Sequence, residues 1–211
     1  MPTAAPHIHA RLALRLAAAA PALPPSVIRF HARALRLAIA RDDEFTLRSA
    51  AEPRQLAALL GLARGRRRIV ELGTATGWTA AAFALADPAR AVVSCDPIGQ
   101  TGRDRYLRLV PPSVLARIAL VRASGVETAA IADGPAVDLL FIDSSHERQP
   151  TIDEWRAWRP RLAAGALVVF HDYDHPDYPG VAQAIEELGL AGRRRDGMFV
   201  WEAPRDGWLP E

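Results

Sequence analysis

Five short apolar runs that alternate with stretches of helical periodicity constrain the fold of this chain more than any other feature. The runs are too continuously apolar for a half-exposed antiparallel sheet, and they suit parallel strands that helices cover on both faces. Strands and helices that alternate in this way predict a doubly wound α/β sheet. The predicted strands are residues 68–72, 91–96, 118–123, 137–143 and 166–172, and the predicted helices are residues 78–86, 103–109, 125–132, 150–162 and 180–188.

The two ends of the chain follow other patterns. Residues 10–20, 27–40 and 49–62 predict helices, and a group of prolines separates the first two. Residues 192–203 predict a turn and a final antiparallel strand. We therefore expect an N-terminal helical extension over residues 1–48 and a single Rossmann-like domain, with a mostly parallel sheet, over residues 49–211.

The composition excludes several chemistries. All 26 basic residues of the 211-residue chain are arginine, so no lysine exists for an internal Schiff base, a P-loop or a general base. The single cysteine, Cys95, excludes an intrachain disulfide and a cysteine-rich metal site. A reducing compartment, and with it a cytoplasmic location, is the default expectation.

Positive charge is concentrated near the N-terminus, because residues 1–41 carry six arginines and no acid. Such a stretch resembles a transit peptide or a membrane-surface helix, but we favour an amphipathic extension that lies on the domain or forms a homodimer contact. No apolar run approaches the roughly 20 residues of a spanning helix, so stable membrane insertion is not expected. Nucleic-acid binding is not expected either, since the arginine runs at 66–68 and 193–195 are not interleaved with aromatic residues.

A turn that contains two glycines follows the first predicted strand. Gly73 and Gly77 allow a sharp turn and let a ligand approach the backbone closely, and the N-terminus of the next helix favours electronegative ligand atoms. The G-x-G-x-x-G spacing of a dinucleotide site is absent. Asp96 ends the second strand, where it can accept hydrogen bonds from ribose hydroxyls, although Pro97 and Gly99 also fit a simple turn. The turn and the acid together indicate an adenosine-containing cofactor.

Acids and histidines follow the fourth and fifth predicted strands. Asp143 and His146 lie at the first of these strand ends, and His171 and Asp172 lie at the second. Clustered carboxylates repel one another unless a cation is present; oxygen ligands suit Mg²⁺, whereas a histidine ligand favours a transition metal. The alternative is that Asp143 caps a helix and His171 packs in the core. We favour a functional cluster because two strand ends contribute to it.

Four segments resemble successive motifs of the class I S-adenosylmethionine-dependent methyltransferases. They are ELGTATGWTAAAFA, CDP, FIDSSHERQPTIDEW and VVFHDYDHPDYPGV. The resemblance covers about residues 50–203 and is closest to a small bacterial subfamily with "IDxxH" and "HDY" strand ends. That subfamily is related to the catechol and caffeoyl-CoA O-methyltransferases and to cephalosporin-biosynthesis-type methyltransferases.

The resemblance implies two cofactors, S-adenosylmethionine and a divalent cation, with Mg²⁺ as the expected ion. It places Glu71, Gly73 and Gly77 around the methionine part, Asp96 at the ribose, and Ser124 and Gly125 near the adenine. The full set of implied cofactor-binding residues is Glu71, Gly73, Thr74, Gly77, Trp78, Asp96, Ser124, Gly125 and Asp143. The implied metal ligands are Asp143, His171 and Asp172.

The same resemblance implies a catalytic base. In catechol-type enzymes a lysine three residues after the first metal-binding aspartate takes the hydroxyl proton, and that offset gives His146 here. Histidine can accept a proton near neutral pH. Two departures from the family pattern are His171, which replaces an oxygen ligand, and Ala75, which stands where many methyltransferases have glycine.

The expected function is metal-assisted methyl transfer to a hydroxyl group of a small molecule. We expect the loop 174–180 to border the acceptor pocket, and Trp155 and Trp158 to lie in the core. One alternative is a metal-independent N- or O-methyltransferase, which chelators would not inhibit. Another is a protein that binds S-adenosylmethionine without catalysis. The glycine spacing disfavours a dehydrogenase.

Overall fold

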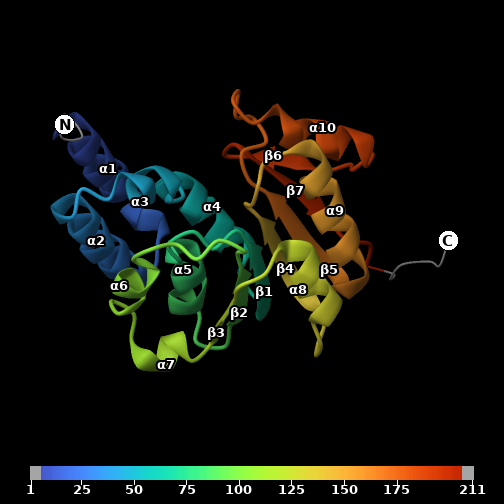
Figure 1. Ribbon diagram of the computed structural model, residues 1–211, viewed down its shortest axis with the longest axis horizontal. Helices are drawn as coiled ribbons and strands as arrows, with labels where there is room; N and C mark the ends of the chain where they lie inside the picture. Colours follow the sequence, from blue (N-terminus) through green and yellow to red (C-terminus); the bar gives the residue numbers. More distant parts are fainter. Residues whose placement is uncertain (1–5, 206–211) are drawn as a thin grey trace.

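The computed structural model describes residues 6–205, and these contain a seven-stranded sheet with the strand order β3-β2-β1-β4-β5-β7-β6. The first five strands in this order are parallel, whereas β7 is antiparallel to both β5 and β6. The predicted α/β fold and antiparallel C-terminal strand are therefore confirmed (Figure 1). The strands are β1 Arg68–Leu72, β2 Ala91–Cys95, β3 Ile118–Val121, β4 Val137–Ile142, β5 Leu162–Phe170, β6 Arg193–Arg195 and β7 Met198–Glu202.

Helices cover both faces of the sheet (Figure 1). Residues alternate along β1, so Ile69 packs with Leu56 of α4 and Phe83 of α5, whereas Val70 packs with Trp155 of α9 on the opposite face. This two-sided burial explains why the strands read as nearly continuous apolar runs. The α-helices are α1 Pro6–Ala19, α2 Pro25–Ala40, α3 Glu44–Ser49, α4 Pro53–Leu62, α5 Trp78–Ala86, α6 Arg103–Leu107, α7 Pro112–Leu115, α8 Gly125–Ile131, α9 Arg148–Trp158 and α10 Pro179–Glu187.

Several predicted boundaries were wrong, and proline explains two of them. The helix expected at 49–62 begins only at Pro53, as α4, after an extended link, and the preceding helix α3 was not predicted. The helix expected at 150–162 ends at Trp158, and Pro160 lies in a short 3₁₀ turn before β5. The helix expected at 103–109 ends at Leu107, and α7 was not predicted. The C-terminal segment forms a hairpin of two strands rather than one strand.

The N-terminal helices pack against the rest of the protein. Val27 of α2 shares a core with Leu56 of α4 and Phe83 of α5, and Phe30 of α2 packs edge-on against Trp78, with ring centroids 6.2 Å apart. The helical extension is thus present, while the domain boundary at residue 48 and the homodimer contact stay predictions. Residues 1–5 and 206–211 of the two predicted segments lie outside the described residues.

The predicted core position of two tryptophans is confirmed. Trp158 is 1% exposed, and its indole Nε1 donates a hydrogen bond of 2.9 Å to the carbonyl oxygen of Gly125. Trp155 is 6% exposed and packs edge-on against Trp201. These side chains tie α9 to α8 and to β7, which stabilises the elements beneath the carboxyl ends of the strands. None of the helices among residues 6–205 has the length and apolar character required to cross a membrane.

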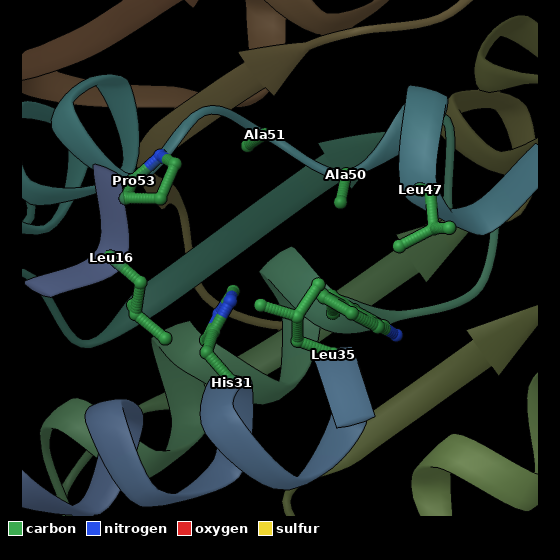
Figure 2. Close-up of a pocket in the computed structure, with 8 residues that line it drawn as sticks. Leu16, His31, Leu35, Leu47, Ala50, Ala51 and Pro53 are labelled. Atoms are coloured by element: carbon green, nitrogen blue, oxygen red, sulfur yellow. The ribbon is translucent and has the colours of Figure 1, made fainter. Parts of the chain in front are cut away.

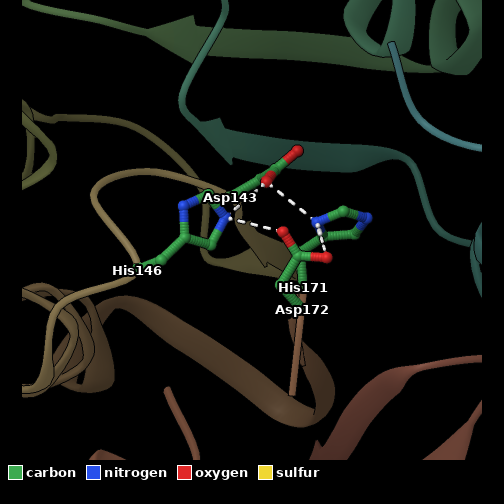
Figure 3. Close-up of side chains that lie close together, drawn as sticks. All are labelled: Asp143, His146, His171 and Asp172. Carbon is green, nitrogen blue, oxygen red and sulfur yellow. Dashed lines mark hydrogen bonds and ion pairs between the residues drawn. The ribbon is translucent and has the colours of Figure 1, made fainter. Parts of the chain in front are cut away.

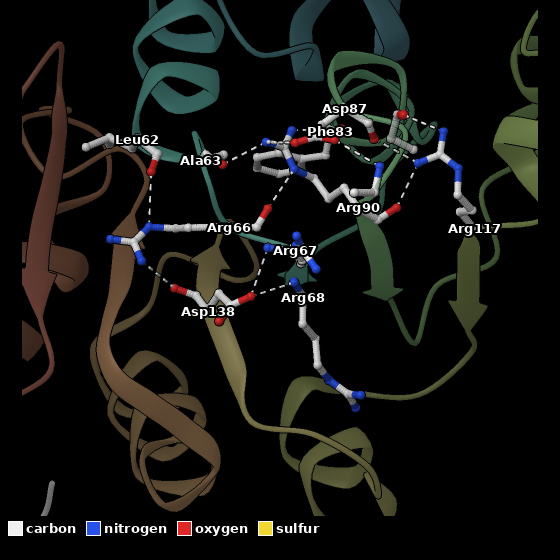
Figure 4. Close-up of polar contacts among 12 residues, drawn as sticks. Leu62, Ala63, Arg66, Arg67, Arg68, Phe83, Asp87, Arg90, Arg117 and Asp138 are labelled. Atoms are coloured by element: carbon white, nitrogen blue, oxygen red, sulfur yellow. Dashed lines mark hydrogen bonds and ion pairs between the residues drawn. The ribbon is translucent and has the colours of Figure 1, made fainter. Parts of the chain in front are cut away.

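Arginines form a polar network at the amino ends of the strands (Figure 4). The guanidinium of Arg90, which is 3% exposed, donates to the carbonyl oxygens of Ala63, Arg66 and Phe83 at 2.7, 3.2 and 2.9 Å. Ala63 caps α4 and Phe83 lies in the last turn of α5, so Arg90 binds carbonyls at the C-terminal ends of two helices. Arg117 extends the network with three further carbonyl contacts.

Candidate functional site

The order of the strands brings the predicted site residues to one place. The sheet reverses its order between β1 and β4, and ligands bind at such a switch point, beyond the carboxyl ends of the strands. Pairing continues just past the strands, since the backbone N–H of Asp143 donates to Leu72 and that of His171 donates to Ile142, at 2.8 and 2.9 Å. Residues that are far apart in sequence therefore emerge side by side.

Four side chains converge there: Asp143, His146, His171 and Asp172 (Figure 3). One possible ligand atom from each lies within 4.8 Å of the others. His146 Nε2 is 3.1 Å from Asp143 Oδ1 and 3.3 Å from Asp172 Oδ2. His171 Nδ1 is 3.1 Å from Asp143 Oδ1 and 3.2 Å from Asp172 Oδ1. The structure thus gathers the three predicted metal ligands and the predicted base in one cluster.

The electrostatics of this cluster are those of a cation site. Burial opposes a charge on His171, but the carboxylates of Asp143 and Asp172 outweigh burial and raise the pKa of His171 to about 10. Burial likewise disfavours the Asp143 carboxylate, yet His171 and His146 hold its pKa well below the usual range. The cluster is most stable when a positive charge lies among these groups, whether a proton or a metal ion supplies it.

One buried nitrogen provides a direct test of whether a metal ion fits. His171 Nδ1 has no hydrogen-bond partner within residues 6–205, although two carboxylate oxygens lie within 3.2 Å, because neither contact has hydrogen-bond geometry. A buried nitrogen whose contacts are ion pairs without hydrogen-bond geometry is incompletely satisfied. Two carboxylates and an imidazole nitrogen that gives up its proton to the incoming ion are a suitable ligand set for a divalent cation.

The backbone and an aromatic neighbour hold His146 in position. The backbone of His146 has a φ of 59°, in the left-handed region that residues other than glycine rarely adopt. Its ring stacks on Tyr178, with centroids 4.6 Å apart and planes inclined by 24°. Gly180 allows this approach, since a Cβ there would lie 2.6 Å from the carbonyl oxygen of His146. The loop that we expected to border the acceptor therefore lies directly against the predicted base.

The glycine turn lies against the same cluster. A Cβ on Gly73 would lie 1.9 Å from the backbone oxygen of Asp143, and the φ of Gly73 is 98°, so only glycine fits at this position. Gly77 also has a positive φ, of 80°, and the next residue, Trp78, begins α5 and is buried. Thr74 is buried in the turn itself. The turn thus holds the helix N-terminus near the metal-ligand candidates.

Glu71 is a buried carboxyl group beneath this turn. It is 1% exposed, and its Oε2 accepts a hydrogen bond of 2.5 Å from Ser94 Oγ, which in turn lies 2.7 Å from Thr74 Oγ1. Burial raises the pKa of Glu71 to about 8, and the hydrogen bond from Ser94 offsets only part of that effect. A cationic ligand group beside Glu71 would favour the ionised form.

Asp96 lies at the end of β2, as predicted, but its carboxylate already has protein partners. Oδ2 accepts hydrogen bonds from the backbone N–H of Ala75 and from Arg103 Nη2, at 2.9 and 3.1 Å, and Oδ1 accepts from the N–H of Ile98 at 2.8 Å. Because a carboxylate oxygen accepts two hydrogen bonds, Oδ1 can take one more donor. A second ribose hydroxyl would donate to Oδ2 only if Arg103 moved away from that oxygen.

Ser124 and Gly125 begin α8, on the other side of the turn. Ser124 forms a capping box with Glu127. A Cβ on Gly125 would lie 2.7 Å from Glu154 Oε1 and 2.9 Å from Leu72 Cδ1, so this glycine permits close packing between α8, α9 and β1. Ser124 and Gly125 therefore have clear structural roles, and their predicted contact with adenine stays a prediction.

Residues that sequence reasoning missed also contribute to the site. Gln55 lies 3.2 Å from His171, Tyr178 stacks on His146, and Arg103 pairs with Asp96. Gln55 is 116 residues away from His171 in sequence, Arg103 is seven residues from Asp96, and neither belongs to a motif. Tyr178 lies within the HDYDHPDYPGV segment, so that segment was the one available signal.

A small cavity lies beneath the N-terminal helices, separate from this cluster (Figure 2). Its volume is about 30 Å³, which is room for roughly two water molecules. The His31 ring points into it, and His31 Nε2 has no hydrogen-bond partner among the described residues. Burial lowers the pKa of His31 to about 4, so the ring is neutral at pH 7. The lining residues are Leu16, His31, Leu35, Leu47, Ala50, Ala51, Pro53 and Trp78.

Comparisons with known proteins agree with this geometry. A family model described as a methyltransferase domain matches residues 70–173, which run from the first strand and the glycine turn to the HDY strand end. No curated protein sequence matches the chain.

Solved structures share the fold. CalS11, a TDP-rhamnose 3'-O-methyltransferase of calicheamicin biosynthesis, has a TM-score of 0.61 and 20% identity, over 96% of each chain. TomG from Streptomyces achromogenes, an O-methyltransferase of tomaymycin synthesis solved with S-adenosylmethionine, has a TM-score of 0.57 and 18% identity, over 73% of this chain and 81% of TomG. An O-methyltransferase family protein from Burkholderia thailandensis has a TM-score of 0.57 and 14% identity, over 79% of this chain and 60% of its own. With the family match, the strand order and the glycine turn in agreement, residues 70–173 form a methyltransferase domain of the class I S-adenosylmethionine-dependent type.

Proposed function

We propose that this protein transfers a methyl group from S-adenosylmethionine to a hydroxyl oxygen of a small molecule, with the help of a divalent cation. The observation that carries the proposal is the convergence of Asp143, His146, His171 and Asp172 beside the glycine turn. A methyl donor and an activated oxygen have to meet in line, and this is the point of the fold where a cofactor site and a cation site adjoin.

The cofactor would lie across the carboxyl ends of β1, β2 and β4. Gly73 and Gly77 leave the turn free of side chains, and Asp96 Oδ1 keeps one position for a ribose hydroxyl. Glu71 lies beneath the turn, where the cationic methionine part would favour its ionised form. The remaining proposed contacts are Thr74, Trp78, Ser124, Gly125 and Asp143.

Asp143, Asp172 and His171 would hold the cation. A divalent ion at such a site supplies Lewis-acid polarisation, which lowers the pKa of an acceptor hydroxyl and orients its oxygen. Mg²⁺ was the expected ion from the resemblance. The nitrogen ligand favours Mn²⁺ or another transition metal over Mg²⁺, so both ions belong in the test.

His146 would take the acceptor proton. Its Nε2 is the ring atom that faces the cluster, and Tyr178 and the left-handed backbone hold the ring in place without using Nε2. The protein has no lysine that could act instead. Methyl transfer itself disperses the sulfonium charge, so alignment and exclusion of water are the main further contributions of the protein.

The acceptor would bind over the cluster, against the loop 174–180. Tyr178 is 40% exposed and stacks on both His146 and His175, so it offers an aromatic surface beside the base. A flat phenol or a sugar ring suits such a surface, and CalS11 acts on a sugar, TDP-rhamnose. The cavity at His31 is too small for either acceptor.

Calorimetric titration tests the cofactor and the cation separately. S-adenosylmethionine and S-adenosylhomocysteine are each titrated into the protein with Mg²⁺, with Mn²⁺ and with EDTA. We expect micromolar cofactor binding, lost in Asp96→Ala, and metal binding, lost in Asp172→Asn. Absence of cofactor binding under every condition would contradict the proposal.

Turnover then separates the proposed mechanism from its rivals. A screen of phenols and sugar nucleotides, with and without EDTA, should find an acceptor whose methylation EDTA abolishes. Methylation that EDTA leaves unchanged would select a metal-independent enzyme, and cofactor binding without turnover of any acceptor would select a non-catalytic binding protein. His146→Ala should lower turnover while metal affinity is kept, whereas loss of both would make His146 a metal ligand.

A further inference from the structure

Gln55 is a residue outside every motif that nevertheless contacts the proposed metal cluster. It lies in the first turn of α4, and its Oε1 is 3.2 Å from His171 Nε2. The amide oxygen can only accept a hydrogen bond, so Nε2 of the imidazole is the donor. Gln55 therefore contacts the ring nitrogen of His171 that faces away from the two carboxylates.

This contact determines which nitrogen of His171 is available to a metal. A neutral imidazole carries one N–H, and the partner of that N–H decides which nitrogen keeps its lone pair. When a metal displaces the proton from Nδ1, the Nε2 proton stays on Gln55, and the lone pair is left at Nδ1, the buried atom 3.1 Å from Asp143 Oδ1 that has no hydrogen-bond partner within the described residues. The tautomer that Gln55 favours is thus the one that presents a ligand atom to the cluster.

The amide of Gln55 is itself held from the opposite side. A Cβ on Gly197, in the β6–β7 turn, would lie 2.9 Å from Gln55 Nε2, so the amide nitrogen rests against a residue without a side chain. Next to it, Arg54 makes an ion pair of 2.8 Å with Asp196. Gly197 and His171 thus lie on two sides of the Gln55 amide, and the exposed Arg54 pair does not touch it.

We propose that Gln55 is a positioning residue for the metal centre: it accepts the Nε2–H of His171 and so holds Nδ1 as a metal ligand. The inference rests on the proposed function, because it requires a metal at Asp143, His171 and Asp172. Partners of this kind orient a ligating histidine and raise its basicity, and their removal weakens metal binding by roughly 10–100-fold.

Titration with Co²⁺, followed by its visible absorption and by calorimetry, tests the proposal without the methyl acceptor. Gln55→Met keeps the length of the side chain but removes the acceptor, and we expect Co²⁺ affinity to fall about tenfold or more, with an altered spectrum. Gln55→Glu restores an acceptor, and we expect affinity and spectrum to return to the wild-type values or beyond. Arg54→Ala, on the same helix and facing the same hairpin, is the matched control and should leave both unchanged. Thermal melts establish that each variant is folded.

Each result supports or overturns the role of Gln55. Wild-type Co²⁺ affinity in Gln55→Met would overturn it, and so would a failure of Gln55→Glu to restore binding, because the loss would then reflect packing. A loss in Arg54→Ala as large as in Gln55→Met would assign the effect to the helix–hairpin contact and overturn the role too. If the wild-type protein binds no Co²⁺, both this inference and the metal part of the proposed function fail, while cofactor binding still tests the rest.

Discussion

The polar side chains at the two edges of the sheet differ in their partners, which are backbone groups at the amino edge and other ionisable side chains at the carboxyl edge. At the amino edge, Arg90 and Arg117 donate to backbone carbonyls, and Asp138 Oδ2 accepts the backbone N–H groups of Arg67 and Arg68 at 2.8 Å each. At the carboxyl edge, two carboxylates lie against two imidazoles, the buried Nδ1 of His171 makes ion pairs without hydrogen-bond geometry, and burial holds Glu71 largely uncharged.

The backbone shows the same difference. Ala75, His146 and Asp172, at the carboxyl edge, all have positive φ angles, which are unfavourable for residues other than glycine. Strain and incompletely paired groups persist where they serve a function. The amino edge therefore stabilises the fold, whereas the carboxyl edge combines the ion pairs of His171 with backbone strain and a buried carboxyl group that ligands would complete.

The largest effect is expected from Asp172→Asn. Asparagine keeps the shape and tolerates the φ of 52°, but it removes one of the charges that would bind the cation. We expect kcat/KM to fall about 1000-fold, or about 4 kcal/mol, with cofactor affinity nearly unchanged and a smaller loss of unfolding free energy from the ion pairs with His146 and His171. Steady-state kinetics, calorimetry and urea unfolding measure the three quantities. A large loss of unfolding free energy with unchanged kcat/KM would instead make Asp172 a structural residue and contradict a functional role for the carboxyl edge.

At the amino edge, Arg90→Met should do the opposite. It leaves three carbonyl oxygens without their donor in a buried position, so we expect the unfolding free energy to fall by roughly 3 kcal/mol. Cofactor affinity should not change. Arg48→Met is the control, because that side chain is 78% exposed and its ion pair with Glu44 contributes little. Urea unfolding in which the two variants lose equal stability would contradict a structural role for Arg90.

Glu71→Gln separates two effects of a carboxyl-edge residue, the effect on folding stability and the effect on cofactor binding. The pKa of Glu71 is about 8 in the folded protein against an ordinary value of 4.5, so at pH 7 unfolding releases its proton and ionisation favours the unfolded state. This penalty grows as pH rises from 4.5 to about 8, and glutamine removes it. At pH 7 we expect the variant without ligands to be more stable by roughly 3 kcal/mol, yet to bind S-adenosylmethionine more weakly. Thermal and urea unfolding over pH 5–9 would show a lower stability instead if the carboxylate were well paired.

The smallest effect is expected at His31, which lies at neither edge. Its folded pKa of about 4 is below the unfolded value of 6.5, so only the unfolded state binds a proton between these values, and stability is lost as pH falls through this window. The loss should be about 2 kcal/mol at pH 5. In His31→Phe this difference in unfolding free energy between pH 7.5 and pH 5 should be absent. Urea unfolding of both proteins at the two pH values measures the difference. An unchanged dependence would mean that His31 finds a partner for its charge.

Sequence reasoning located the strands and their ends more reliably than the helix boundaries. Buried parallel strands produce apolar runs that need no partner to be recognised, so the strand ends that carry Asp96, Asp143 and His171 were predicted within a few residues. The division between α3 and α4 depends on how Pro53 packs, and the short helix α7 has too few residues for a periodic signal.

The sequence by itself determined which kinds of group the site contains: a glycine turn, an acid at the end of the second strand, and acids with histidines at two further strand ends, in a chain without lysine. Only the tertiary structure decided how these groups meet. It directed His146 Nε2 and His171 Nδ1 at the same carboxylates, placed Tyr178 on His146, and brought Gln55 from α4 to His171, 116 residues away in sequence. The physical reason is that side-chain chemistry is local to each residue, whereas distances, tautomers and burial depend on the register and packing of the whole sheet.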